Sequence, residues 1–186
     1  MAWIAGERVI LRAWEREDVR TRWEADQSAD AEAQRLRDWH EAPRSLFQRE
    51  QEFEAGQSEP ESSEVSLIIE ADGRAVGDIN LFQIDTRDQR ALIGLSIWRR
   101  DDWDKGYGTD AMRAMMRWGF REMNLHRIEL EVDVDNKRAI HVYEKLGFVS
   151  EGRRREQHFD GGRFRDALIM GMLARDFPDG CGSRPA

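Results

Sequence analysis

The sequence has a single cysteine, no internal repeat and no long run of apolar residues. Cys181 therefore cannot form an internal disulfide, and one cysteine alone cannot build a zinc site. Charged residues interrupt every apolar stretch well before the roughly 20 residues that a membrane span needs. The N-terminus also lacks a basic flank followed by an apolar segment, so no secretory signal is expected. We therefore expect neither a disulfide-stapled nor a membrane protein, and we expect it in the cytoplasm.

The chain carries a formal net charge of -8, with a pI near 5.1. A negative field disfavours non-specific binding to nucleic acid and favours cationic partners. The same charge also keeps a protein soluble, so it does not mark a particular site. No metal is predicted, because the histidines show no metal-ligand spacing with one another or with cysteine. They are His40, His126, His141 and His158.

The length of 186 residues fits one hydrophobic core. We expect a single domain over residues 1–175 and a flexible tail over residues 176–186, where the composition turns to Gly, Pro and Asp. Near the N-terminus, Val9-Ile10-Leu11 predicts a strand. The stretch from about Glu15 to Gln57 is rich in helix formers, and a break is expected near Ala42-Pro43, because proline restricts the residue before it.

From Val65 onward the pattern changes to strands and turns. Val65–Glu70 and Ala75–Phe82 flank Ala71-Asp72-Gly73, which predicts a hairpin. The helix predicted at Thr109–Met123 has apolar residues three and four positions apart. The other expected elements are strands Ala91–Trp98 and Arg127–Val134, helix Asn136–Leu146 with Gly147 as its C-cap, and a hairpin of Glu151–Phe159 with Phe164–Met172. This order indicates a mixed α/β (α+β) domain with partly antiparallel strands.

The segment Lys105-Gly106-Tyr107-Gly108-Thr109 connects a predicted strand to a predicted helix. Two glycines let backbone N–H groups converge without obstruction by a Cβ atom. A helix N-terminus adds unpaired N–H donors and a partial positive charge, which suits a pyrophosphate. A plain strand-to-helix turn would fit the glycines equally well. The segment fits neither the P-loop pattern nor the dinucleotide fingerprint, which needs a third glycine.

Several segments in order resemble one family. Trp103-Asp104-Lys105-Gly106-Tyr107-Gly108-Thr109-Asp110-Ala111 resembles the pyrophosphate loop of the GNAT family of N-acetyltransferases. Trp103 stands where that family usually has Gln or Arg. This replacement is common in the subgroup that resembles ribosomal-protein N-terminal acetyltransferases. Asn136 to Phe148 resembles the family's second motif. Gly6 to Arg12 resembles the opening strand, and Asp160 to Asp166 resembles the C-terminal hairpin.

The resemblance implies a mostly antiparallel mixed sheet, flanked by helices, whose fourth and fifth strands splay apart. Those strands would be Ala91–Trp98 and Arg127–Val134, and the cofactor would be acetyl-CoA. Backbone groups of Ile97, Trp98 and Arg99 would pair with the pantetheine amides. The remaining coenzyme-binding residues implied by the family are Asp104, Lys105, Gly106, Tyr107, Gly108, Thr109, Asn136 and Lys145. Asn136 also suits the N-cap of the following helix.

The resemblance also assigns chemistry to Tyr143. A phenol has a pKa near ~10, so it is protonated at neutral pH and can donate a proton to a departing thiolate. In the family, the tyrosine at this position lies near the coenzyme sulfur. Spacing alone favours a core aromatic on the helix face of Ile140 and Leu146, and the resemblance reverses that preference.

Glu131 is the expected general base, because some N-terminal acetyltransferases of the family use a glutamate twelve residues before this tyrosine. Strand alternation places Glu129, Glu131 and Asp133 on one face of the sheet. That face could equally be solvated and without a catalytic role. Asp78 is a second candidate base. A dedicated base is also not always required, because orientation of the reactants supplies much of the rate. A backbone N–H near Ile97 or Trp98 would stabilise the oxyanion.

The acceptor is expected to be a peptide N-terminal amine or a small cationic amine. The family forms part of its acceptor site from the N-terminal helical region, where aromatic and acidic residues occur. They are Trp23, Trp39, Glu24, Asp26, Asp30 and Glu32. For any one of them, a solvated helical face with some core tryptophans is the simpler interpretation. The run Arg153-Arg154-Arg155 could reach the coenzyme's 3′-phosphate or form a solvated strand edge. The alternative to an enzyme is a catalytically silent acyl-CoA-binding sensor. Family members often form homodimers, and no nucleic-acid or membrane partner is expected.

Overall fold

The computed structural model describes residues 4–27, 44–58, 63–160 and 162–178. The chain divides into two compact units. The first unit comprises residues 1–80 and 95–114, and the second comprises residues 81–94 and 115–186. The single domain over residues 1–175 stays a prediction. The predicted flexibility of the tail over residues 176–186 also stays a prediction, because residues 179–186 lie outside the described residues.

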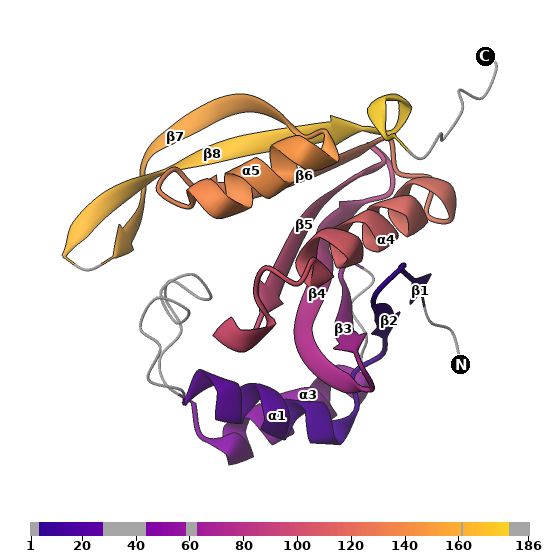
Figure 1. Cartoon of the computed structure of the whole chain (residues 1–186), viewed down its shortest axis with the longest axis vertical. Helices are drawn as coiled ribbons and strands as arrows, with labels where there is room; N and C mark the ends of the chain where they lie inside the picture. Colours follow the sequence, from indigo (N-terminus) through magenta and orange to yellow (C-terminus); the bar gives the residue numbers. More distant parts are fainter. Residues whose placement is uncertain (1–3, 28–43, 59–62, 161, 179–186) are drawn as a thin grey trace. The chain divides into compact units, whose positions relative to one another are not determined.

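Eight strands form one sheet in the order β1-β2-β3-β4-β5-β6-β8-β7 (Figure 1). The strands are β1 (Ile4–Ala5), β2 (Ile10–Arg12), β3 (Val65–Ala71), β4 (Arg74–Asp85), β5 (Arg90–Ile97), β6 (Arg127–Asp133), β7 (Val149–Asp160) and β8 (Arg163–Leu173). The helices are α1 (Arg16–Asp26), α3 (Leu46–Ser58), α4 (Tyr107–Arg121) and α5 (Lys137–Leu146), with short 3₁₀ turns η1 (Arg100–Asp102) and η2 (Ala174–Asp176). The mixed α/β prediction is confirmed.

In the first unit, β2 pairs antiparallel with β1 and β3. Buried Ala25 of α1, Ile68 of β3 and Trp98 form an apolar cluster there, with Trp14 packed against it. The turn between β3 and β4 consists of Asp72 and Gly73, both with positive φ, at 52° and 73°. Those two conformations are what a two-residue hairpin turn requires, and Asp-Gly is a favoured pair for it. The predicted hairpin is confirmed.

In the second unit, β8 pairs antiparallel with both β6 and β7. Ile128, Leu130 and Val132 of β6 are buried, whereas Glu129 and Glu131 are half-buried, so the predicted alternation holds from Ile128 to Val132. Asp133, the third predicted acid of that face, is buried. Helix α5 lies along β6 and β8 (Figure 1) and contributes buried Ile140 and Leu146. Beyond η2, Phe177 is buried, and its ring lies 5.4 Å from that of Phe120.

Strands β5 and β6 pair in parallel over only three residues, from Arg90 with Arg127 to Leu92 with Glu129. Both strands continue beyond these pairs, β5 to Ile97 and β6 to Asp133. The pairing of β5 with β6 therefore ends before either strand does, as expected for the two strands that were predicted to splay apart.

Several element boundaries differ from the sequence prediction by a few residues, and one short strand was not predicted. Helix α4 begins at Tyr107, not at Thr109, so the second glycine already lies in its first turn. Glycine lowers helix propensity, which hides such a start in the sequence. The short strand β1 at Ile4–Ala5 was not expected, because two residues give no periodic pattern.

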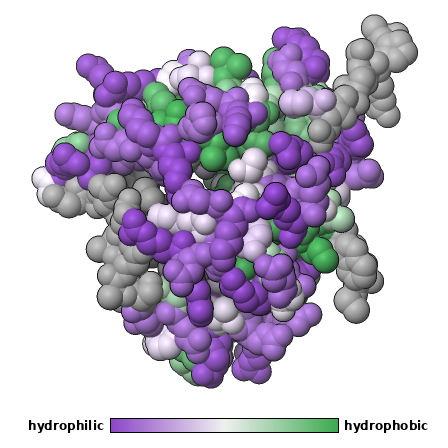
Figure 2. Space-filling view, viewed as in Figure 1, coloured by the Kyte–Doolittle hydropathy of each residue, from purple (hydrophilic) through white to green (hydrophobic). Residues whose placement is uncertain are grey.

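Polar and charged side chains cover most of the face shown in Figure 2. Within residues 4–27, 44–58, 63–160 and 162–178, no helix is long and apolar enough to cross a membrane. Several residues singled out in the sequence lie outside the described residues. They are Asp30, Glu32, Trp39, His40 and Cys181.

Candidate active site

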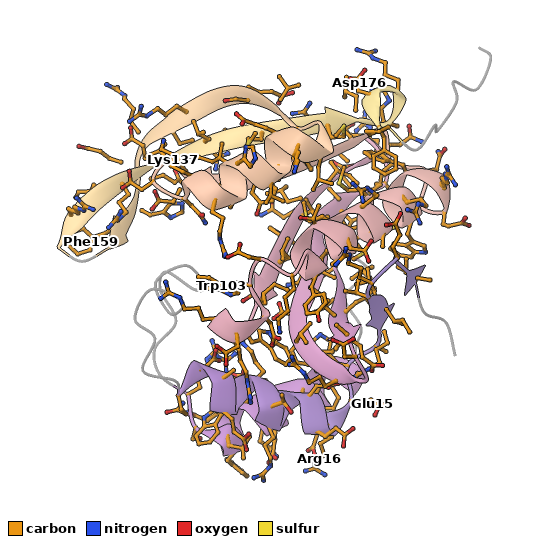
Figure 3. All side chains as sticks on the ribbon, in the orientation of Figure 1. Glu15, Arg16, Trp103, Lys137, Phe159 and Asp176 are labelled. Carbon is orange, nitrogen blue, oxygen red and sulfur yellow. The ribbon has the colours of Figure 1, made fainter. Side chains whose placement is uncertain are left out.

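The predicted pyrophosphate turn lies between β5 and α4 in the first unit, and Trp103 lies on this connection (Figure 3). Gly106 has a φ of 83°, a conformation that residues with a Cβ atom rarely adopt. A Cβ atom at Gly108 would lie 3.2 Å from the Leu95 side chain, so the helix start packs closely on β5. The first N–H groups of α4 have no partner within the helix. The backbone here fits an anion such as a pyrophosphate.

Asp110 in the first turn of α4 fixes the helix start to the N-terminal strand region. Its carboxylate accepts hydrogen bonds from the backbone N–H groups of Glu7 at 3.1 Å, Arg8 at 2.7 Å and Val9 at 3.0 Å. Gly6 leaves room for it, because a Cβ atom there would lie 2.3 Å from an Asp110 oxygen. Asp110 is buried, so these donors satisfy most of its hydrogen-bonding capacity.

Asp102 holds the other side of the turn. Its carboxylate is 1% exposed and accepts hydrogen bonds from Arg74 at 2.5 and 2.9 Å and from Lys105 Nζ at 3.1 Å. The hydrogen bonds from Arg74 lower the pKa of Asp102 below its usual value. The predicted phosphate ligand Lys105 is therefore paired with a buried carboxylate.

Tyr107, another predicted coenzyme ligand, is a packing residue in this structure. It is buried, and its hydroxyl donates a hydrogen bond of 2.7 Å to Asp72 in the β3–β4 turn. This bond raises the pKa of Tyr107. Asp104 has a φ of 57°, and Thr109 is half-buried. Whether Asp104, Tyr107 and Thr109 contact the coenzyme stays a prediction.

The end of β5 carries the backbone groups expected to meet the pantetheine. The Trp98 N–H donates to the Val76 carbonyl at 3.0 Å, so sheet pairing already uses this N–H. Neighbouring N–H groups of a strand point to opposite edges, and Ile97 therefore directs its N–H away from β4. Of the two predicted oxyanion donors, Ile97 is the better placed. Its carbonyl accepts a hydrogen bond of 3.1 Å from the Trp103 indole, and Arg99 is exposed.

Asp78, the second candidate base, is engaged in the first unit. Its Oδ1 atom accepts a hydrogen bond of 2.5 Å from the Trp98 indole and also forms an ion pair with Arg22. Arg22 also lies 5.7 Å from the Trp98 ring centroid. Asp78 thus helps to position Trp98, and whether Asp78 or Glu131 acts as a base stays a prediction. Two residues expected near the acceptor lie on α1, the helix that carries Arg22. The Trp23 indole donates a hydrogen bond to the Arg44 carbonyl, and Glu24 is exposed.

Tyr143 lies on α5 in the second unit, half-buried, with its ring 6.0 Å from Phe148 in an edge arrangement. Burial raises its pKa to about 12. The hydroxyl is therefore protonated throughout the neutral range, as a general acid requires. Within the described part of the chain, the Tyr143 hydroxyl has no hydrogen-bond partner.

Asn136 was expected to cap the following helix and to bind the coenzyme, and it does cap α5. Its side-chain oxygen accepts a hydrogen bond of 3.1 Å from the Ala139 N–H. Gly147 ends the helix with a φ of 100°, the left-handed C-cap predicted from the sequence. Lys145 is exposed in the last turn of α5. Contacts of Asn136 and Lys145 with the coenzyme stay predictions.

Glu131 on β6 is held by two side chains from β7. Its carboxylate accepts a hydrogen bond of 2.6 Å from Arg154 and lies 2.6 Å from the His158 Nε2 atom. The Glu131 side chain is 21% exposed and His158 is 18% exposed, so solvent reaches both. Sequence reasoning missed His158 because it lies 27 positions away and is brought close only by strand pairing.

The arginine run on β7 forms ion pairs within the second unit. Arg153 binds Asp166 at 2.5 Å and Arg154 binds Glu131 at 2.6 Å. These ion pairs agree with the solvated strand edge, and a contact of the run with the 3′-phosphate stays a prediction. In the described part of the chain, no group of His, Cys, Asp or Glu could hold a metal ion.

The chain is similar to proteins of one family. A model of the acetyltransferase (GNAT) domain matches residues 8–149. The spermidine N(1)-acetyltransferase of Escherichia coli K12 is 33% identical over 169 residues, 91% of this chain and 88% of that protein. The putative ribosomal N-acetyltransferase YdaF of Bacillus subtilis is 30% identical over 107 residues, 57% of each chain.

A solved structure gives the same result. The Vibrio cholerae spermidine N-acetyltransferase in complex with CoA and spermine aligns with a TM-score of 0.79 and 27% identity, covering 91% of this chain and 97% of that one. The chain therefore belongs to the GNAT family and is an acetyl-CoA-dependent enzyme that transfers an acetyl group to an amine.

Proposed function

We propose that the acceptor is a small aliphatic amine with more than one positive charge, of the polyamine class. The observation that carries this proposal is the relationship to the Escherichia coli spermidine enzyme, which covers 91% of this chain. The net charge of -8 supports it, because a negative field concentrates polycations near the protein. A peptide N-terminal amine is the second candidate. It rests on the resemblance to ribosomal-protein acetyltransferases and on a relative that shares 57% of the chain.

We assign roles to the residues of each unit separately. When bound, acetyl-CoA supplies the acetyl thioester. Gly106 and the first N–H groups of α4 would hold its pyrophosphate, because the turn is open to an anion and carries no Cβ at its centre. Tyr143 holds a proton at its hydroxyl and donates it. Glu131, with His158 beside it, takes a proton from the acceptor ammonium.

The proposal is tested by release of free thiol from acetyl-CoA in the presence of an amine panel. The panel contains spermidine, spermine, an aminoglycoside, a lysine-free peptide with a free N-terminus and the same peptide with a blocked N-terminus. We expect polyamine-dependent release, with kcat/KM for spermidine at least about tenfold above the free peptide. A higher kcat/KM for the free peptide would replace the polyamine by the N-terminal amine as acceptor.

The same assay separates the enzyme from a silent sensor. Micromolar CoA binding by calorimetry together with no release for any amine would leave only the binding module. Self-association follows the same reasoning, because the Vibrio cholerae spermidine enzyme is described as dodecameric. We therefore propose a homo-oligomer, which sedimentation of the purified chain would test. The ribosomal subgroup and the cytoplasmic location stay predictions.

A further inference from the structure

The turn before α4 is short of free positive charge on its own segment. Lys105, its one lysine, directs its Nζ atom to Asp102 at 3.1 Å. Asp102 is almost fully buried and also binds Arg74, so these cations offset a carboxylate. Exposed Asp101 and Asp104 add negative charge nearby in the sequence, and exposed Arg99 and Arg100 add positive charge there. A pyrophosphate bound at the turn would gain from a further cation placed next to Gly106.

Arg8 supplies such a cation in the first unit. Its Nη1 atom donates a hydrogen bond of 3.2 Å to the carbonyl of Lys105. A Cβ atom built on Gly106 would lie 3.8 Å from the Arg8 Cδ and Nε atoms and 4.0 Å from its Cζ atom. The guanidinium thus lies beside the space that a side chain at Gly106 would occupy.

The position of Arg8 is fixed by the same carboxylate that fixes the helix. The Arg8 backbone N–H donates to Asp110 at 2.7 Å, and the Asp110 N–H in turn donates to the Gly106 carbonyl at 3.0 Å. The side chain itself is exposed. Among the described residues, the Lys105 carbonyl is the hydrogen-bond partner of the guanidinium. A guanidinium has five N–H donors, so four remain for a ligand.

We propose that Arg8 is a further coenzyme-binding residue whose guanidinium pairs with the pyrophosphate of acetyl-CoA. Arginine suits this task because its planar fork matches the oxygens of a phosphate and stays charged at any physiological pH. The backbone N–H groups of α4 fix the anion's position, and Arg8 closes over it from the N-terminal strand region. The inference rests on the proposed assignment of the pyrophosphate to this turn.

The test compares wild type, Arg8→Gln, Arg8→Lys and the control Arg87→Gln, which changes an exposed arginine in the β4–β5 turn. Calorimetry gives Kd for CoA, for dephospho-CoA and for pantetheine. One charge-assisted hydrogen bond is commonly worth a factor of about ten or more in affinity. We expect Arg8→Gln to weaken CoA and dephospho-CoA by at least about tenfold and pantetheine by less than about twofold. Arg8→Lys should lose less, and Arg87→Gln should match wild type.

Three outcomes overturn the proposal. An equal loss for pantetheine would mean that Arg8 acts only on the fold, which a lower melting temperature would also report. A loss for CoA but not for dephospho-CoA would move the contact to the 3′-phosphate. If the wild-type protein bound dephospho-CoA and pantetheine with equal affinity, the pyrophosphate would not bind at this turn. That last result concerns the site assignment and is distinguishable from a failure of Arg8 alone.

Discussion

The turn before α4 and strand β6 both carry candidate chemistry, but they are built in different ways. In the turn, Asp102 and Asp110 are buried and bound by structural partners, and what faces a ligand is backbone N–H. On β6, the carboxylate of Glu131 is partly exposed and its partners come from side chains of β7. We therefore expect coenzyme binding to depend on the backbone of the turn together with the proposed contact from Arg8, and proton transfer to depend on the side chains of Glu131 and Tyr143. Substitutions in the turn should cost stability, and substitutions around β6 and α5 should cost turnover.

Asp110→Ala should have the largest effect and should act on the fold. It removes the acceptor for the N–H groups of Glu7, Arg8 and Val9, the last of which is buried. We expect a loss of about 4 kcal/mol in the free energy of unfolding, measured by urea denaturation. Asp101→Ala is the matched control, because Asp101 is exposed on η1, and it should change stability by less than about 0.5 kcal/mol. Equal effects of the two changes would contradict a structural role for Asp110.

Tyr143→Phe should act on turnover alone. Phenylalanine keeps the ring packing against Phe148 but removes the proton that the hydroxyl would donate. We expect kcat to fall by about 100-fold, with Kd for CoA within about twofold of wild type. A large loss of CoA affinity with unchanged kcat would show that the hydroxyl binds rather than donates.

The raised pKa of Tyr143 predicts how stability depends on pH. An unfolded tyrosine titrates near ~10, whereas burial holds the folded pKa at about 12. Below pH ~10 both states are protonated and stability is flat; between pH ~10 and ~12 only the unfolded state loses its proton, so stability falls. The fall should be roughly 2 kcal/mol, and Tyr143→Phe should lack it. The measurement is the difference between the two proteins in urea melts from pH 9 to 12. Parallel curves for both proteins would place the Tyr143 pKa near its ordinary value.

Glu131→Gln should lower kcat/KM by about tenfold at neutral pH, because the amide cannot accept a proton from the acceptor. The matched variant is Arg154→Gln, which removes one cation from the same carboxylate. If Glu131 is the base, Arg154→Gln retains most activity. If the Arg154–Glu131 pair is only structural, both variants lose the same activity.

Gly106→Ala should have the smallest effect. A residue with a Cβ atom at a φ of 83° costs about 1 kcal/mol of stability, and the same strain should weaken CoA binding. Gly152→Ala is the control, because a Cβ atom at Gly152 meets no atom within 4 Å. Unchanged CoA affinity in Gly106→Ala would contradict the dependence of binding on backbone shape.

Features set by neighbouring residues were predictable from the sequence. The Asp72-Gly73 turn, the Asn136 cap and the Gly147 C-cap were predicted, and each depends on residues within one turn of chain. The alternation of β6 was predicted for the same reason.

Features that join distant residues were not predictable. Asp110 is an ordinary acid in a first helical turn until the fold brings residues 7–9 to its carboxylate. Likewise, nothing local links Asp102 to Arg74 or Glu131 to His158. The sequence showed which backbone could bind an anion, but not that Lys105 is paired or that Arg8 lies beside Gly106.

The hydrogen bonds to Asp110 have a consequence for synthesis on the ribosome. Glu7, Arg8 and Val9 precede Asp110 by 103, 102 and 101 positions. At bacterial elongation rates of about 5–20 residues per second, these N–H groups wait on the order of 5–20 s for their acceptor. Until then water is their partner, and a nascent chain that stops short of residue 110 cannot complete the support of the α4 turn. The two ends of this contact are therefore separated by more of the chain than those of the other hydrogen bonds described above.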